Sequence, residues 1–154
     1  MTSPRRAAIH EIRVPIVSDA DAVTARQHGR DAALRIGLSR SEATFVATAI
    51  SEIARNIVVH VGRGEIVLRA EEDDTRCGLV VIARDRGTGI RDLDAALHDD
   101  YSGRQGLGLG LPGARRLMDE FDVASDADGT TVTMKKWRFR DELARLREAR
   151  RGRD

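Results

Sequence analysis

The stretch from Ala83 to Gly113 constrains the fold more than any other part of the chain. It starts at the end of an apolar strand, passes the carboxylate of Asp85 and two glycines, and ends in three alternating glycines. Glycines let main-chain N–H groups approach a ligand without interference from a Cβ atom, which suits a polyphosphate. The glycine spacing matches neither a Walker A loop nor the dinucleotide fingerprint. We therefore expect a nucleotide pocket of another kind, with a polar lid between the glycine clusters.

The composition points to one domain and disfavours several classes of protein. A chain of 154 residues can bury about two-thirds of its unfolded surface in one core. Its 26 basic and 25 acidic residues give a net charge of +1, which provides no global field to attract nucleic acid or an anionic membrane. The single cysteine, Cys77, excludes an intramolecular disulfide and a zinc cluster. No apolar run could span a bilayer and no signal peptide is evident, so we expect a cytoplasmic protein.

Apolar periodicity and turn residues predict grouped helices and strands. The expected order is an edge strand at 8–17, helices at 20–36 and 42–60, a hairpin of strands at 65–70 and 78–84, a helix from Leu111 to about Glu120, and strands at 121–124 and 130–137. Because the helices do not alternate with every strand, this order favours an α+β sandwich with one mixed sheet. We assign residues 1–137 to the domain and residues 138–154 to a basic tail that we expect to be helical. The tail is either a solvated or docked terminal helix or an element that binds a partner or a second copy.

The helix expected over residues 42–60 has two distinct faces. Its apolar residues recur at i, i+4, i+7 and i+11 and predict a stripe facing a core: Val46, Ile50, Ile53 and Ile57. Glu52, Asn56 and His60 lie four residues apart, so they share one flank that can border a cavity. His60 is either a histidine that stabilises the end of the helix or part of the pocket rim. The N-terminus of the helix at Leu111 adjoins the glycines, where its dipole favours a phosphate.

Three segments resemble a known superfamily. Glu52-Ile-Ala-Arg-Asn56, Asp85-Arg-Gly-Thr-Gly89 and Gly106-Leu-Gly-Leu-Gly-Leu-Pro-Gly113 occur in the order of the ATP-binding boxes of the GHKL ATPases and kinases. The runs TAISEIARNI and GLPGARRLMDEF are similar to RsbT-type serine/threonine switch kinases, with RsbW/SpoIIAB-type anti-sigma factors next. The resemblance covers roughly residues 12–137. It implies a two-layer Bergerat ATP-binding sandwich with a glycine-rich ATP lid, and ATP and Mg²⁺ as cofactors.

The resemblance also implies a role for each matching residue. Asp85 would accept a hydrogen bond from the adenine amino group, Asn56 would offer its amide oxygen to magnesium, and Glu52 would orient or deprotonate the attacking hydroxyl. Arg104 would neutralise charge on the γ-phosphate, with a solvated loop arginine as the alternative. The other nucleotide-contacting positions implied are Gly87, Gly89, Gly106, Gly108, Gly110 and Thr130.

The function that the resemblance implies is a serine/threonine protein kinase of a bacterial partner-switching, stress-response pathway. Its substrate would be a STAS-domain antagonist or scaffold protein, and its later partner an effector such as a PP2C-type phosphatase. The alternative is an anti-sigma factor that sequesters a sigma factor and phosphorylates its antagonist. A histidine-kinase catalytic fragment is disfavoured because no phosphoacceptor helix hairpin precedes Glu52. We expect no nucleic-acid or membrane partner, and a homodimer is compatible with the resemblance.

Overall fold

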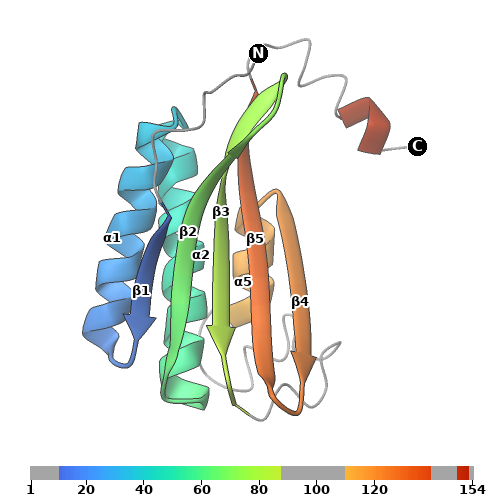
Figure 1. Cartoon of the computed structure of the whole chain (residues 1–154). Coiled ribbons are helices and arrows are strands. Elements are labelled where there is room, and N and C mark those ends of the chain that lie inside the picture. Colours follow the sequence, from blue (N-terminus) through green and yellow to red (C-terminus); the bar gives the residue numbers. More distant parts are fainter. Residues whose placement is uncertain (1–10, 88–109, 140–148, 153–154) are drawn as a thin grey trace.

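The computed structural model describes residues 11–87, 110–139 and 149–152. Within them the elements follow the order β1 (Ile12–Ile16), α1 (Asp19–Arg35), α2 (Arg40–His60), β2 (Gly64–Glu72), β3 (Arg76–Asp85), α5 (Gly110–Leu117), β4 (Glu120–Asp126) and β5 (Gly129–Phe139). The strands form one sheet, and the three helices lie against one of its faces (Figure 1). This confirms the expected two-layer α+β sandwich. Residues 149–152 are helical, and β5 extends two residues beyond the expected end of the last strand.

The sheet is antiparallel throughout, so the prediction of a mixed sheet was wrong. Its strand order is β1-β2-β3-β5-β4, and every neighbouring pair is antiparallel. The connection through α5 does return the chain in the direction of β3, as a helical crossover does. However, β4 then takes the outer edge and β5 folds back into the gap between β3 and β4. The two parallel strands are therefore neighbours of β5 and not of each other.

Serine caps fix where the two long helices begin. Ser18 and Ser39 each accept a hydrogen bond from the third helical residue, Asp21 and Glu42, whose side chains in turn accept the N–H of the capping serine. These reciprocal pairs satisfy backbone donors that the first turn leaves free. The predicted apolar stripe of α2 is confirmed, because all four of its residues are buried: Val46, Ile50, Ile53 and Ile57.

Helix α1 packs through small residues rather than through its large apolar ones. Its buried residues are Ala25, Gly29, Ala32 and Ala33, whereas Val23 is 62% exposed. A Cβ atom on Gly29 would lie 2.1 Å from Cδ1 of Ile50, so α1 and α2 approach closely at this point. The helix expected at 20–36 is confirmed, but its large apolar residue Leu34, like Val23, is exposed.

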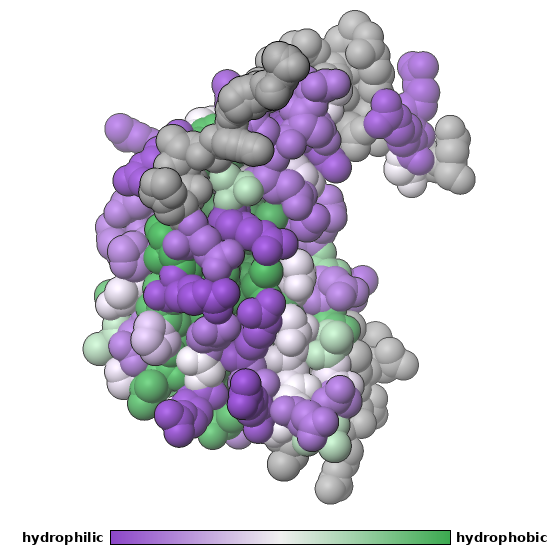
Figure 2. All heavy atoms as spheres, viewed as in Figure 1, coloured by the Kyte–Doolittle hydropathy of each residue, from purple (hydrophilic) through white to green (hydrophobic). Residues whose placement is uncertain are grey.

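The two faces of the sheet differ in character. The face toward the helices carries the main core, including Ile66, Leu68, Leu79, Val81 and Met134. On the opposite face, Val67, Val80 and Ile82 form a small second buried cluster among charged neighbours. Figure 2, which views this opposite face, shows hydrophilic side chains covering most of it, with apolar surface between them. None of the helices in the described residues is long and apolar enough to cross a bilayer.

Candidate functional site

Four backbone segments meet at one end of the sandwich, the lower end in Figure 1. They are the end of β3, the start of β5, the second half of α2 and the N-terminus of α5. A row of paired residues crosses the helix-facing side of the sheet here. Asp85 of β3 pairs with Gly64 of β2 and with Thr130 of β5, and Thr130 pairs with Ser125 of β4. The topology therefore brings polar groups from three adjacent strands to the same end of the sheet.

The carboxylate of Asp85 is held by backbone donors through one of its oxygens. Oδ1 accepts the N–H of Gly87 at 2.9 Å and the N–H of Thr130 at 3.3 Å. The other oxygen, Oδ2, accepts no hydrogen bond from another described residue. The hydroxyls of Thr130 and Ser125 lie 2.8 Å apart and share a hydrogen bond, and Thr130 is buried. Two backbone N–H groups thus fix one oxygen of the carboxylate.

Gly129 allows the β4–β5 hairpin to approach Asp85. Its φ is +146°, and a Cβ atom there would lie 2.1 Å from the backbone oxygen of Asp85. The sequence predicts a hairpin turn at Asp128-Gly129. In the structure the turn residues are Ala127 and Asp128, and Gly129 is the first residue of β5. Gly129 therefore allows close contact between β5 and β3 as well as the turn of the hairpin.

Glu52 joins α2 to the start of α5. Its Oε1 accepts a hydrogen bond of 3.3 Å from the N–H of Gly110, the first residue of α5. Gly110 has φ of +55°, a left-handed conformation that glycine adopts without steric cost. A carboxylate at this position also matches the positive end of the helix dipole. The acidic group predicted to be catalytic therefore contacts Gly110, the last of the three alternating glycines.

Asn56 and His60 follow Glu52 along the same flank of α2. Asn56 is half-buried, and its side chain makes no hydrogen bond to another described residue. His60 is the last residue of α2 and is exposed, as expected of a histidine at a helix C-terminus. In the described part of the chain, no group of three or more His, Cys, Asp or Glu side chains could hold a metal ion.

Hydrogen bonds join five of the predicted site residues in two groups: Glu52 with Gly110, and Asp85 with Gly87 and Thr130. A sixth, Asn56, lies one turn beyond Glu52 on α2 and is half-buried. Four others lie outside the described residues: Gly89, Arg104, Gly106 and Gly108. Sequence reasoning missed Ser125 and Gly129, which support Thr130 and Asp85. A hairpin of known register would have indicated Ser125, because it lies directly opposite Thr130.

Comparison with known proteins agrees with this arrangement. The family of histidine kinase-like ATPase domains matches residues 16–136. The serine/threonine-protein kinase RsbT of Bacillus subtilis is 43% identical over 125 residues, which are 80% of this chain and 94% of RsbT. An anti-sigma F factor of Clostridium kluyveri is 32% identical over 100 residues, covering 62% of this chain and 70% of that protein.

A solved structure of the RsbU and RsbW domains of a Mycobacterium tuberculosis protein has a similar fold. The match has a TM-score of 0.57 and a sequence identity of 26%. It covers 87% of this chain and 34% of the larger chain. The fold and the row of polar groups beside a glycine segment define a kinase-like ATPase domain, and the chain belongs to the histidine kinase-like ATPase family. Within that family it falls in the group of the RsbT kinase and the anti-sigma F factors, and it is an ATP-using domain of the partner-switching type.

Proposed function

We propose that this protein transfers the γ-phosphate of ATP to a serine or threonine of a STAS-domain antagonist or scaffold protein. Release from the phosphorylated partner then frees it to bind an effector such as a PP2C-type phosphatase. The observation that carries the proposal is 43% identity to RsbT over 94% of that kinase's length. The arrangement around Glu52 and Asp85 supports the same chemistry.

The purine end of the site is Asp85. Because two backbone N–H groups occupy Oδ1, the carboxylate presents Oδ2 in a fixed orientation. A fixed acceptor suits the exocyclic amino group of adenine and disfavours guanine, which carries a carbonyl at that position. The buried hydroxyl of Thr130, one strand away, supplies a second polar contact for the base.

The reacting end of the site is Glu52. Its Oε1 is engaged by Gly110, while Oε2 accepts no hydrogen bond from another described residue and can receive the proton of a substrate hydroxyl. Phosphoryl transfer needs positioning and charge neutralisation more than covalent help from the protein. A carboxylate anchored to the N-terminus of α5 lies where α5 would also meet the phosphates.

Asn56 fits a magnesium ion shared with ATP. A half-buried amide oxygen one helical turn from Glu52 is a hard donor of the type that Mg²⁺ uses. Magnesium completes its shell with phosphate oxygens and water, so a single protein ligand is consistent with the absence of a multi-ligand cluster among the described residues. When bound, the ion would neutralise phosphate charge. Asn56 would hold it, and Glu52 would orient the nucleophile.

Phosphate transfer from radiolabelled MgATP to candidate STAS proteins tests the proposal. We expect Glu52→Gln to lower the transfer rate by about 100-fold or more, since positioned general bases contribute about that much, while ATP still binds. Arg55→Gln changes an exposed residue of the same helix and serves as the matched control. Equal phosphate incorporation by wild type and Glu52→Gln would contradict the assigned role.

A second candidate function is that of an anti-sigma factor. It is favoured by the similarity to the Clostridium kluyveri anti-sigma F factor. Capture experiments with the purified chain separate the two. Retention of a STAS protein without any sigma factor supports the RsbT-type role, and nucleotide-dependent retention of a sigma factor supports the other.

A further inference from the structure

Lys136 is a buried charge that the proposed reaction does not use. It is only 8% exposed, and among the described residues Thr130 and Lys136 are the buried polar ones. Its Nζ donates a 2.8 Å hydrogen bond to the backbone oxygen of Leu117, the last residue of α5, and lies 3.5 Å from Oδ1 of Asp119. The ring of Phe45 lies 5.2 Å from the same ammonium group. Burying a lysine is costly unless it is paired, and here the Leu117 carbonyl and the Asp119 carboxylate supply the partners.

The two ends of α5 are held by side chains of opposite charge. Glu52 accepts the N–H of Gly110 at the N-terminus, and Lys136 donates to Leu117 at the C-terminus. Each charge matches the sign of the helix dipole that it meets. With both ends tied to different elements, α2 and β5, the helix is fixed along its own axis.

We propose that Lys136 is a positioning residue for the phosphates of the nucleotide. This inference rests on the proposed function, in which the N-terminus of α5 faces those phosphates. Helix α5 has only eight residues, including two glycines and a proline, so its intrinsic helix propensity is low. Contacts with other elements must therefore stabilise it and fix its position. Lys136 fixes the far end of the helix, and so fixes where the N–H groups of its first turn point.

The adenine end of the site does not depend on this contact. Asp85 lies on β3 and is oriented by N–H groups of Gly87 and Thr130, neither of which belongs to α5. Loss of the Lys136 contact should therefore weaken the binding of phosphates and leave the binding of the base unchanged. If the substitution only lowered the stability of a protein that remains folded, binding of the phosphates and binding of the base would not be affected differently.

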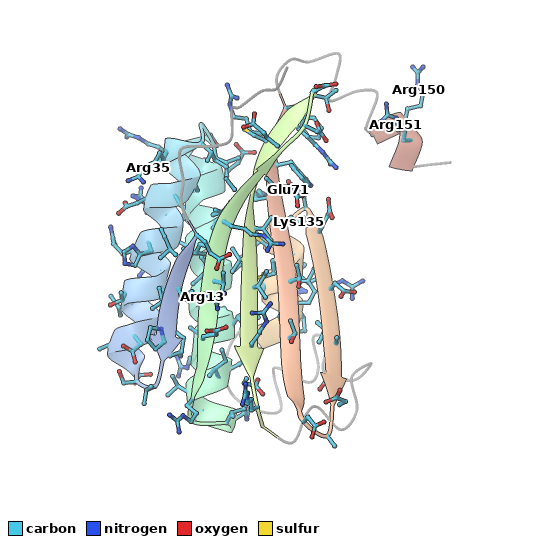
Figure 3. The ribbon with its side chains drawn as sticks, in the orientation of Figure 1. Arg13, Arg35, Glu71, Lys135, Arg150 and Arg151 are labelled. Atoms are coloured by element: carbon cyan, nitrogen blue, oxygen red, sulfur yellow. The ribbon has the colours of Figure 1, made fainter. Side chains whose placement is uncertain are left out.

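Calorimetry with the whole chain tests this separation, using MgATP, MgADP and adenosine as ligands. Lys136→Met removes the charge and the donor, and Lys136→Arg keeps both. Lys135→Met is the matched control, because Lys135 is the preceding residue of β5 and lies on the opposite face, where its Nζ contacts Glu71 at 3.0 Å (Figure 3).

We expect Lys136→Met to raise Kd for MgATP and MgADP about tenfold, which corresponds to about 1.4 kcal/mol, with Kd for adenosine unchanged. Lys136→Arg and Lys135→Met should bind all three ligands as the wild type does. Should Lys136→Met not fold, Lys136→Gln, which keeps a donor without the charge, carries the same comparison. Equal changes for ATP and adenosine, or none for either, would overturn the inference. Failure of the wild type to bind ATP would instead count against the proposed function.

Discussion

The N–H of Thr130 donates a 3.3 Å hydrogen bond to Oδ1 of Asp85 across the β3–β5 pair. The bond means that the acidic side chain expected to recognise adenine is oriented by the backbone of the neighbouring strand. Selectivity for the base then depends on the register of the sheet, which pairs these two residues directly. Changes that alter this register or the charge of Asp85 should therefore act on the nucleotide before they act on the fold.

Replacing Asp85 with asparagine should abolish the preference for adenine. The two backbone N–H groups would still need an oxygen, so they would hold the amide with its NH₂ group toward the ligand. A donor would then face the amino group of adenine. Because a hydrogen bond to a charged group contributes about 1.5–3 kcal/mol, we expect ATP affinity to fall about 10-fold to 150-fold in calorimetry.

Asp122→Asn is the control for that experiment. Asp122 is exposed on the edge strand β4 and lies outside the row that contains Asp85. The variant loses one negative charge without touching the site, so its ATP affinity should equal that of the wild type. An Asp85→Asn protein that binds ATP as tightly as Asp122→Asn would show that the carboxylate does not read the base.

Replacing Asn56 with alanine should change the magnesium dependence of ATP binding. Loss of one hard oxygen ligand leaves the ion to be held by phosphate and water alone. We expect affinity for MgATP to fall about tenfold toward that for metal-free ATP, a loss of about 1.4 kcal/mol. Titration of ATP at several Mg²⁺ concentrations measures this. Arg55→Ala, next in the helix and exposed, should keep the full magnesium effect.

Two glycines with positive φ should respond differently to alanine. Gly62 has φ of +102° with open space around it, so Gly62→Ala should cost only the conformational strain, about 1–2 kcal/mol in urea unfolding. Gly129→Ala adds a clash with the backbone of Asp85 and should cost about 3 kcal/mol or more. It should also weaken ATP binding, whereas Gly62→Ala should not. Equal stability losses would argue against the close contact between the hairpin and β3.

Asp73, at the tip of the β2–β3 hairpin, should give the domain part of its acid sensitivity. Slight burial raises the pKa of this carboxyl, but hydrogen bonds from the backbone and hydroxyl of Thr75 and from the backbone of Arg76, with the nearby Arg76 guanidinium, lower the pKa by more. A pKa lowered on folding contributes stability that is present above about pH 4 and is lost as the pH falls through the folded value. Asp73→Asn should flatten this loss of stability in urea unfolding measured below about pH 4.

A matching control for the hairpin is Asp74→Asn, since Asp74 is its exposed neighbour. It should retain the slope of stability against pH that the wild type shows. If both variants lose stability in acid as the wild type does, the hydrogen bonds to Asp73 do not contribute to the pH dependence of the stability.

Most of the fold could be predicted from sequence because its signals are local. The stripe of α2, the hairpin of β2 and β3 and the edge strand β1 each depend on residues close in the chain. The direction of the sheet could not, since inserting β5 between β3 and β4 depends on long-range pairing that leaves no local pattern. The packing of α1 was missed for a related reason: Ala25 and Gly29 matter because α2 comes so close.

The site divides in the same way. Asp85 and Glu52 could be recognised from sequence because each lies in a short motif that resembles a known family. Ser125, Gly129 and Lys136 lie in no such motif, and their contacts are made with residues that are distant in the chain or across a hairpin. Their roles follow only from strand register and helix placement. The residues that support the site can therefore be identified only from the three-dimensional structure.

The five residues that begin α5, from Gly110 to Ala114, are all buried, and two glycines and a proline in the helix oppose its formation. A peptide with this sequence would not be helical in water, so α5 exists only while it is docked on α2 and β5. If α5 meets the nucleotide as proposed, ligand occupancy and the local folding of this eight-residue helix are parts of one equilibrium. Saturation with nucleotide should slow amide exchange over residues 110–117 more than anywhere in α1, and heating should melt this helix before the sheet.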